Sequence, residues 1–203
     1  MTVNEELLDS FLAGERPVYT LYEPQEVTIV LGAGRGAEED VDLRQALADG
    51  VPILKRKGGG GTVVLSPGQI VLALVTRVLR PFANREYFQA LGGWFKEALR
   101  ALGVEGLEER GISDLAIGER KVLGSSLYRS RLLLFYQASL LVCNDLSLFS
   151  LYLSPPRRAP EYRAGREHQS FCTTLAREGY SLTPRQVAAS LQRVVARNLP
   201  GLV

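Results

Sequence analysis

The sequence predicts an α+β fold: a single domain, residues 1–203, with a central mixed and largely antiparallel β-sheet that helices flank. Three observations predict it. Apolar, β-branched runs dominate the middle of the chain and are joined by short turns, which is typical of antiparallel or mixed sheets. Segments with helical periodicity lie at both ends and between these runs. With 203 residues, 46% of them apolar and 23% charged, the chain has the size and composition of one globular domain.

Local signals divide the N-terminal half into elements. Thr2-Val3-Asn4-Glu5 is a capping box that starts a helix ending at Gly14. The inner face of this helix is formed by Leu7, Leu8, Phe11 and Leu12. Strands are predicted at residues 18–22, 27–31, 53–56, 62–65 and 70–75, with a turn at residues 66–69. A short helix at residues 40–48 is expected to place Leu43 and Leu47 inward.

Local signals also divide the C-terminal half into elements. A long amphipathic helix begins at Asn84, which we expect to cap it, and ends at Gly103. A hairpin follows, with strands at residues 112–117 and 120–123. Residues 132–142 are a predicted strand, residues 146–153 a short helix, and residues 154–166 an irregular segment rich in proline and arginine. Thr183-Pro184-Arg185-Gln186 opens the last helix with a cap, a proline and a capping-box glutamine.

Composition and charge exclude several classes of protein. The net charge of +2 implies no strong field for nucleic acid or membranes, so neither is an expected partner. The acidic N-terminal stretch does not resemble a signal peptide, and no apolar run approaches the ~20 residues of a membrane helix. Two cysteines do not make a disulfide framework, which favours a reducing, cytoplasmic location. A single histidine, His168, excludes a histidine-rich zinc site.

The chain is organised around a glycine-rich segment. Lys55, Arg56 and Lys57 run into four glycines, and Thr62 opens the next strand. These glycines are Gly58, Gly59, Gly60 and Gly61. Without Cβ atoms, such a loop lets a flat ligand lie on the backbone, and the adjacent cations suit a phosphate or a carboxylate. It is not a Walker loop, because no Lys-Ser or Lys-Thr follows the last glycine. The alternative is a flexible surface connection.

A second glycine motif, Gly32-Ala33-Gly34-Arg35-Gly36-Ala37, has the outline of a dinucleotide fingerprint. The acidic residues 38–40 that follow it would repel a pyrophosphate. We therefore favour a glycine turn that brings Arg35 near the main site.

The predicted hairpin supplies a second group of candidate residues. Because side chains alternate along a strand, Lys121 points away from the face on which Val122 packs. Gly124, Ser125 and Ser126 then combine close backbone approach with hydroxyl donors. The alternative is a solvated hairpin lysine.

Together, these two segments resemble two motifs of the lipoate–protein ligase family, which shares ancestry with octanoyltransferases and biotin ligases. The family's R-R-x-S-G-G-G-[AT]-V-Y-H-D-x-G-N is matched at Lys55, Arg56, Gly59–Gly61, Thr62, Val63 and Gly68. Its N-D-L-x-x-x-G-K-K-I-S-G-N-A is matched at Asp114, Leu115, Lys121 and Gly124. The chain departs where the family has Tyr-His-Asp, Asn and His-His-Gly-Thr: at Val64-Leu65-Ser66, Ser113 and Tyr136-Gln137-Ala138-Ser139.

The resemblance implies a biotin/lipoate ligase-like fold and an acyl-transfer reaction. ATP and Mg²⁺ would activate lipoate as lipoyl-AMP, and the acyl group would pass to a lysine of a lipoyl carrier domain, of the 2-oxoacid dehydrogenase E2 or glycine cleavage H protein type. It makes Lys121 the catalytic residue at the acyl oxygen and phosphate. Arg56 would meet the ligand's carboxyl or phosphate, and Asp114 would orient the carrier lysine or the adenylate. Ser125 and Ser126 would bind the nucleotide, and the other binding residues are Gly58, Gly59, Gly60, Gly61, Thr62, Ser113 and Gly124; no metal ligands are identified.

Two alternative functions stay open. Transfer of an octanoyl group from acyl carrier protein needs a thiol nucleophile. Cys172 is the better candidate, because His168 lies one helical turn before it, whereas Cys143 is expected to be a core cysteine. The other alternative is a non-catalytic homologue that binds lipoate or a carrier.

Two further expectations concern partners. The chain lacks room for the family's C-terminal accessory domain, so an accessory subunit is a possible partner. A basic run near the end is either a docking face for an acidic carrier or a solvated loop. It consists of Arg157, Arg158, Arg163 and Arg166.

Overall fold

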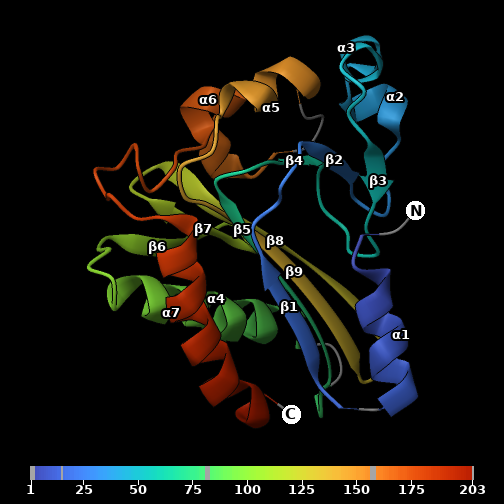
Figure 1. Ribbon diagram of the computed structural model, residues 1–203, viewed down its shortest axis with the longest axis vertical. Coiled ribbons are helices and arrows are strands. Elements are labelled where there is room, and N and C mark those ends of the chain that lie inside the picture. Colours follow the sequence, from blue (N-terminus) through green and yellow to red (C-terminus); the bar gives the residue numbers. More distant parts are fainter. Residues whose placement is uncertain (1–2, 15, 81–82, 156–158, 203) are drawn as a thin grey trace.

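The strands of the protein form two sheets, seen in a computed structural model that describes residues 3–14, 16–80, 83–155 and 159–202 (Figure 1). The larger sheet has six strands in the order β1-β5-β9-β8-β7-β6. Every neighbouring pair in it is antiparallel. Its strands are β1 (Val18–Tyr22), β5 (Gln69–Arg77), β6 (Leu107–Arg110), β7 (Asp114–Ile117), β8 (Arg120–Ser130) and β9 (Leu133–Leu141).

The smaller sheet has three strands in the order β3-β2-β4. They are β2 (Thr28–Leu31), β3 (Ile53–Lys55) and β4 (Val63–Leu65). β2 runs parallel to β3 and antiparallel to β4. The two sheets together confirm the predicted α+β fold with mixed, largely antiparallel strands.

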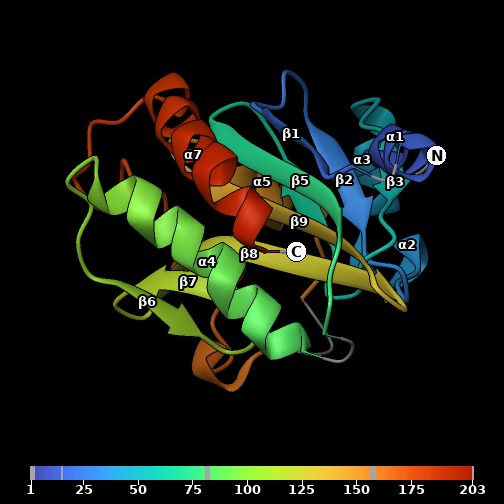
Figure 2. The ribbon, with the colours of Figure 1, turned by 90° about the horizontal axis from the view of Figure 1, so that it is seen from below.

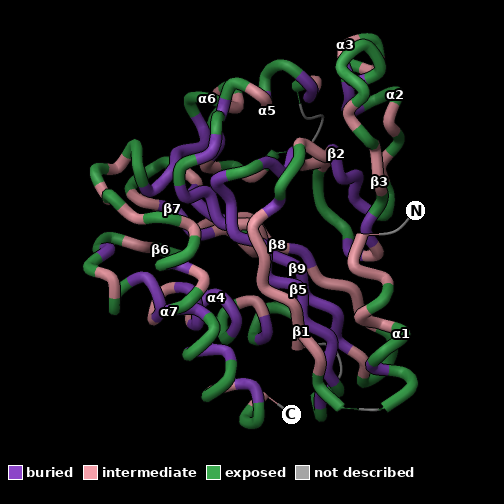
Figure 3. The backbone as a smooth tube through the Cα atoms, in the orientation of Figure 1, coloured by how far each residue is buried: buried purple, intermediate pink, exposed green. Residues whose placement is uncertain are grey.

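Helices and the smaller sheet cover the two faces of the larger sheet. α4 (Asn84–Arg100) and α7 (Pro184–Asn198) lie side by side on one face, as Figure 2 shows, and they pack on side chains such as Leu72 and Tyr136. α1 (Glu5–Gly14) lies on the other face, where Phe11 meets Phe135. Because β5 is covered on both sides, its residues 69–76 are all buried (Figure 3).

The remaining helices are short. They are α2 (Ala37–Asp40), α3 (Leu43–Ala48), α5 (Ser147–Tyr152), the 3-10 turn η1 (Glu161–Arg163), α6 (His168–Phe171) and the 3-10 turn η2 (Leu199–Gly201). α2, α3, α5 and α6 lie beyond one end of the larger sheet (Figure 1), whereas η2 continues α7 and buries Leu199 in the core. No helix among the described residues is both long and apolar enough to cross a membrane.

The helix predicted at residues 40–48 begins only at Leu43, as α3, and a separate short helix, α2, ends at Asp40. Val41 is extended and forms a β-bridge with Leu153, which interrupts the helix. The Asp42 side chain then caps α3 by accepting a hydrogen bond from the Gln45 amide at 2.9 Å. Leu47, expected inward, is 76% exposed. Helical periodicity alone was therefore a poor guide here, because a tertiary bridge decided where the helix breaks.

The helix ends give a mixed outcome. The capping box of Thr183 and Gln186 at the start of α7 is confirmed. The cap predicted at Asn84 is wrong, because Ala83 occupies that position and forms no side-chain bond. Thr2 of the first capping box lies outside the described residues, and Leu12 of that helix is exposed rather than inward. β6 was not predicted, because Leu-Glu-Glu-Arg lacks an apolar alternation; it is an edge strand that pairs only with β7.

Candidate active site

Arg56 holds the backbone of the glycine loop, residues 56–61, in place. Its guanidinium donates hydrogen bonds to the carbonyls of Gly59 at 2.8 Å, Gly61 at 2.6 Å and Val30 at 3.3 Å. The residue is only 7% exposed. This burial lowers the pKa of Arg56 from its usual value to about 10. In this structure the guanidinium therefore faces the loop itself, and its predicted contact with a ligand's carboxyl or phosphate stays a prediction.

The two cations beside Arg56 have other partners. The Lys55 ammonium donates to the Arg35 carbonyl at 3.3 Å. The Lys57 ammonium lies 3.3 Å from a carboxylate oxygen of Glu5 in α1. The three consecutive cations thus contact three separate parts of the protein.

Close packing explains several of the glycines. A Cβ atom on Gly58 would lie 2.8 Å from Ser126 Oγ in β8, so the loop rests directly on the larger sheet. A Cβ on Gly32 would lie 2.2 Å from the Gly60 carbonyl oxygen, and the Ala33 amide donates to the Gly58 carbonyl at 3.0 Å. The second glycine motif is therefore a turn that supports the glycine loop, as favoured above. By contrast, Gly59 and Gly61 have open space where a Cβ would lie.

Lys121 and Asp114 form an ion pair on the hairpin of β7 and β8. Lys121 Nζ lies 2.8 Å from Asp114 Oδ1, and the two side chains are 25% and 10% exposed. Val122 is buried, so the predicted facing of Lys121 is confirmed and the solvated hairpin lysine is wrong. A Cβ on Gly124 would lie 2.7 Å from Lys121 Nζ. Glycine at 124 thus leaves the space in which the ammonium crosses its own strand to reach Asp114.

Tyr162 contacts the same carboxylate and was not predicted. Its hydroxyl donates a hydrogen bond of 2.9 Å to Asp114 Oδ2. Burial and the neighbouring Asp114 charge raise the pKa of Tyr162 well above its usual range, so the hydroxyl remains a donor. Its ring packs on Phe171 with centroids 5.0 Å apart. No periodicity in the sequence links Tyr162 to the hairpin, because the two are 48 positions apart.

The predicted nucleotide-binding serines lie on opposite faces of β8. Ser126 shares the face of Gly124 and the glycine loop, since alternate residues of a strand point the same way. Gln137 lies opposite Ser126 in the register, and its side-chain amide donates to the Val3 carbonyl at 3.3 Å. Ser125 points to the α4 side, where its hydroxyl donates to the Ser113 carbonyl at 2.9 Å. Ser113 and Ser125 are therefore separated from the Lys121 ammonium by the sheet.

Thr62 also contacts protein groups. Its hydroxyl donates to Asp40 Oδ2 at 2.6 Å, and Arg35 Nε lies 3.6 Å from the same oxygen. Asp40 is buried. The Thr62 hydroxyl thus ties the end of the glycine loop to α2, and its predicted role in ligand binding stays a prediction.

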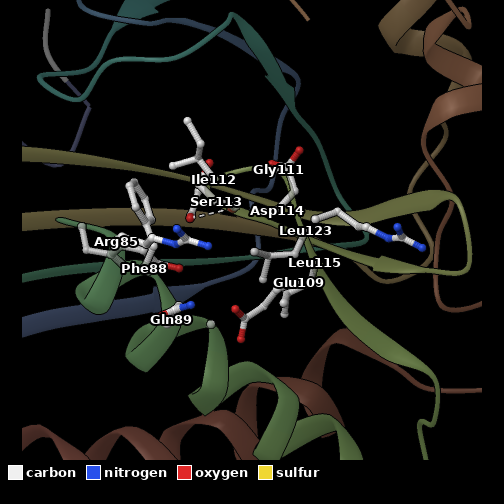
Figure 4. Close-up of a pocket in the computed structure, with 14 residues that line it drawn as sticks. Arg85, Phe88, Gln89, Glu109, Gly111, Ile112, Ser113, Asp114, Leu115 and Leu123 are labelled. Atoms are coloured by element: carbon white, nitrogen blue, oxygen red, sulfur yellow. Dashed lines mark hydrogen bonds between the residues drawn. The ribbon is translucent and has the colours of Figure 1, made fainter. Parts of the chain in front are cut away.

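A cavity of about 170 Å³ lies on the α4 side of the hairpin. Arg85, Phe88 and Gln89 of α4 border it opposite Ile112 and Ser113 (Figure 4). Tyr136 lines it too, and its fully buried hydroxyl has no hydrogen-bond partner among the described residues. Burial raises the pKa of this hydroxyl, against the opposing effect of the neighbouring Ser125 side chain, so it stays protonated.

The thiols do not have the features of an activated nucleophile. Burial raises the pKa of Cys172, against the opposing effect of Lys121 and Arg163, and a nucleophilic thiol needs the reverse. Burial and the same two cations lower the pKa of His168 to about 4. Within the described part of the chain, no side-chain hydrogen bond joins His168 to Cys172. Cys143 is exposed, so its assignment to the core is wrong.

The predicted basic docking face is only partly visible. Arg157 and Arg158 lie outside the described residues. Arg163 is buried, with its guanidinium over the Phe171 ring at 5.0 Å, so it does not belong to a solvated or docking surface. Arg166 stacks on the same ring at 5.4 Å and donates to the Glu119 carbonyl at 2.9 Å. These two arginines fix the segment that carries Tyr162.

Most of the sequence matches a known family profile, and parts of it match individual relatives. The profile described as "Lipoyl protein ligase A/B catalytic domain" matches residues 1–196. The lipoate-protein ligase A subunit 1 of Thermoplasma acidophilum is 26% identical over 165 residues, which are 77% of this chain and 62% of the relative. A lipoate-protein ligase A homologue of Aeropyrum pernix is 32% identical over 121 residues, 59% of this chain and 44% of the relative. The matches thus span less than two thirds of both relatives.

Solved structures show the same fold. The bipartite lipoate protein ligase of T. acidophilum, described together with its E2 lipoyl domain, superposes with a TM-score of 0.79 and 21% identity over 92% of this chain and 72% of that chain. A lipoate-protein ligase A bound with ATP superposes with a TM-score of 0.80 and 22% identity over 97% of this chain and 78% of that chain. At these identities the likeness establishes the fold, and the chemistry has to be argued from the residues of this chain.

Proposed function

This chain belongs to the lipoyl protein ligase A/B catalytic domain family, and on that premise we propose that residues 1–203 act as a catalytic domain in protein lipoylation. The domain activates lipoate as lipoyl-AMP, transfers the lipoyl group to a lysine of a lipoyl carrier domain, or does both. In the first step, a lipoate oxygen attacks the α-phosphorus of ATP and pyrophosphate leaves. In the second, the carrier amine attacks the acyl carbon, the bond to AMP breaks and the amine loses a proton.

The observation that carries this proposal is the placement of the Lys121 ammonium. It lies over Gly124, 2.8 Å from Asp114, on the face of β8 where Gly58 meets Ser126. An acyl adenylate laid along that face would put its carbonyl and phosphate oxygens within reach of one fixed positive charge. Both steps develop negative charge on those oxygens, and a charge already in place stabilises it with little reorganisation.

The other residues of the site have supporting roles. Gly58 to Gly61 form a wall of backbone without side chains, against which the acyl chain and adenylate lie. Arg56 keeps that wall in shape through its three carbonyl contacts. Asp114 holds the Lys121 ammonium and orients it toward the ligand or the carrier lysine. An acyl adenylate held between the loop and the sheet would be shielded from water, which would otherwise hydrolyse the mixed anhydride.

ATP and Mg²⁺ differ in how well the residues fit them. Lys121 and the bare loop backbone suit the negative phosphates of ATP. Among the described residues, no group of three or more His, Cys, Asp or Glu side chains could hold a metal ion. We therefore assign no protein ligands to Mg²⁺ and no step to it.

The named relatives suggest the partners. A lipoyl carrier of the E2 or H protein type is the proposed acceptor, because the T. acidophilum bipartite ligase is described with its E2 lipoyl domain. An accessory subunit is the second proposed partner, because the relative from that organism is named subunit 1. Neither cysteine is in a disulfide, which fits the cytoplasm as the proposed location.

A carrier-lipoylation assay followed by mass spectrometry tests the proposal. The purified protein is mixed with a lipoyl carrier domain and lipoate, ATP and Mg²⁺, or with chemically made lipoyl-AMP, or with an octanoyl-carrier donor. Mass gain with lipoate and ATP would establish the complete reaction. Gain only with lipoyl-AMP would mean a transfer domain that needs an adenylation partner.

The other outcomes contradict the proposal. Gain only with the octanoyl donor would move the nucleophile to Cys172. No gain with any donor, together with retained lipoate binding in calorimetry, would indicate a binding protein.

A further inference from the structure

We propose that Tyr162 is a positioning residue for Lys121 and acts through Asp114. The inference rests on the proposed function and deepens it, because it adds a residue from outside both sequence motifs to the site. Tyr162 itself need not touch the acyl adenylate. Its role is to fix the carboxylate that in turn fixes the catalytic ammonium.

The two oxygens of the Asp114 carboxylate contact different donors. Oδ1 receives the Lys121 ammonium at 2.8 Å, and Oδ2 receives the Tyr162 hydroxyl at 2.9 Å. Since each oxygen has its own donor, rotation of the carboxylate would break both contacts. Asp114 is therefore held in one orientation, and Lys121, a flexible four-carbon stem, is held with it.

The segment that carries Tyr162 is attached to the hairpin at several further points. Arg166 donates to the Glu119 carbonyl at 2.9 Å, and it also donates to the Tyr162 carbonyl. Cys172 forms a parallel β-bridge with Lys121. The Thr173 amide donates to the Lys121 carbonyl at 2.9 Å. Tyr162 thus reaches Asp114 from a segment that already packs against the backbone of Lys121.

Removal of the hydroxyl should misplace the ammonium without unfolding the site. Tyr162→Phe keeps the ring on Phe171 and the arginine contacts, but it leaves Asp114 Oδ2 without its donor. The matched control is Tyr152→Phe, because Tyr152 makes the same kind of bond, 2.8 Å to Asp49 Oδ2, away from Lys121. The two variants lose the same type of bond, but Asp49 Oδ2 keeps a second donor, the Gln45 side-chain amide at 2.8 Å.

The first readout is steady-state transfer from lipoyl-AMP to a carrier domain. We expect kcat to fall roughly 10-fold in Tyr162→Phe with KM within about twofold, because a charge-assisted hydrogen bond orients a catalytic group that acts on the transition state. Tyr152→Phe should stay at the wild-type rate. Equal rates in the two variants would overturn the proposal.

A double-mutant cycle tests the route through Asp114. Asp114→Asn should lower kcat by itself, and adding Tyr162→Phe to it should change kcat by less than about twofold, because the second change removes a contact that acts only through the carboxylate. Full additivity of the two losses would overturn the proposal.

The second readout needs no activity. Pulse acetylation followed by peptide mapping measures the reactivity of each lysine, and the chain has three others: Lys55, Lys57 and Lys96. Lys96 is the internal reference, because its side chain is 29% exposed, against 25% for Lys121, and it also faces a carboxylate. Tyr162→Phe should raise labelling of Lys121 relative to Lys96 by about threefold or more, since the ammonium is no longer held. Tyr152→Phe should leave the ratio unchanged.

This readout separates the inference from the proposed function. If the wild-type protein transfers no acyl group from any donor, the proposed function fails, yet the labelling ratio still decides whether Tyr162 holds Lys121. Should Tyr162→Phe not fold, Asp114→Asn with Tyr162 in place must raise the same ratio. An unchanged ratio in the variant that folds would overturn the positioning role.

Discussion

The glycine loop and the hairpin of β7 and β8 each contain a conspicuous cation, and the two cations do different work. Arg56 is buried and donates hydrogen bonds to three backbone carbonyls. Lys121 is a quarter exposed and contacts one carboxylate. A guanidinium, with several donors in a fixed plane, can hold a loop that consists mostly of glycine. An ammonium with a single partner remains available to a ligand. The difference teaches that Arg56 shapes the glycine loop, whereas Lys121 has the freedom that its proposed catalytic role requires.

The largest expected effect is on the stability of the loop. Arg56→Leu should lower the free energy of unfolding by about 3 kcal/mol, because three buried or half-buried carbonyls lose their donor. Urea denaturation measures it. The matched control is Lys57→Gln, which removes only a partly exposed pair with Glu5 and should cost less than about 1 kcal/mol. Equal losses in the two variants would contradict the structural role of Arg56.

The second effect concerns catalysis by the hairpin. Lys121→Ala should lower the rate of carrier lipoylation from lipoyl-AMP by about 100-fold, because the charge that stabilises the developing oxyanion is lost. Its free energy of unfolding should change by less than about 1 kcal/mol, since the pair with Asp114 is partly exposed. Lys96→Ala is the control and should keep the wild-type rate. Full activity of Lys121→Ala would remove the lysine from the mechanism.

The third effect is a pH dependence beside the hairpin. The pKa of His168 is about 4 in the folded protein, below the usual 6.5, owing to burial and then to the charges of Arg163 and Lys121. The unfolded chain therefore binds more protons between these two values, so stability falls as the pH drops from about 6.5 to 4. The free energy of unfolding of His168→Gln should therefore fall by about 1–2 kcal/mol less than that of the wild type over this pH range, after allowance for solvent screening. Unfolding curves at neutral pH and near pH 4.5 for both proteins measure the difference.

The same histidine distinguishes the two cations. Lys121→Met should move the pKa of His168 upward, because one of the cations that oppose its protonation is removed. Arg56→Leu should leave it unchanged, since Arg56 is not among the charges that act on His168. Titration by NMR follows this single histidine without ambiguity. An equal shift of the His168 pKa in both variants would mean that Arg56 and Lys121 act on this histidine to the same extent.

The smallest expected effect is on stability and concerns Tyr136, on the α4 side of the hairpin. Tyr136→Phe should raise the free energy of unfolding by about 1 kcal/mol, because it removes a buried hydroxyl that has no partner among the described residues. Tyr87→Phe is the control and should have the opposite sign, since the Tyr87 hydroxyl donates to the Arg80 carbonyl at 3.0 Å. A loss of stability in Tyr136→Phe would show that this hydroxyl has a partner in solution.

Part of this site followed from the sequence, and part of it depended on where the strands end and on tertiary contacts. The glycine loop, the strands around it and the facing of Lys121 follow from local chemistry and strand alternation. The predicted strand ended at residue 123, whereas β8 continues to Ser130. Ser125 and Ser126 therefore lie on opposite faces of a strand, which their joint assignment to a nucleotide did not take into account. The break between α2 and α3 could not be predicted, because it depends on the bridge between Val41 and Leu153.

By itself, the sequence determined which residues have the chemistry to bind or act on a ligand, and in what order they occur. A run of cations and glycines comes first, and a hairpin with an aspartate, a lysine and a glycine follows. Only the tertiary structure decided what each group contacts. It buried Arg56 among carbonyls, supported Gly60 with Gly32 and brought Tyr162 to Asp114. The physical reason is that side-chain type and local periodicity are encoded over a few residues, whereas burial, charge pairing and hydrogen-bond partners depend on segments that meet only when the sheets pack.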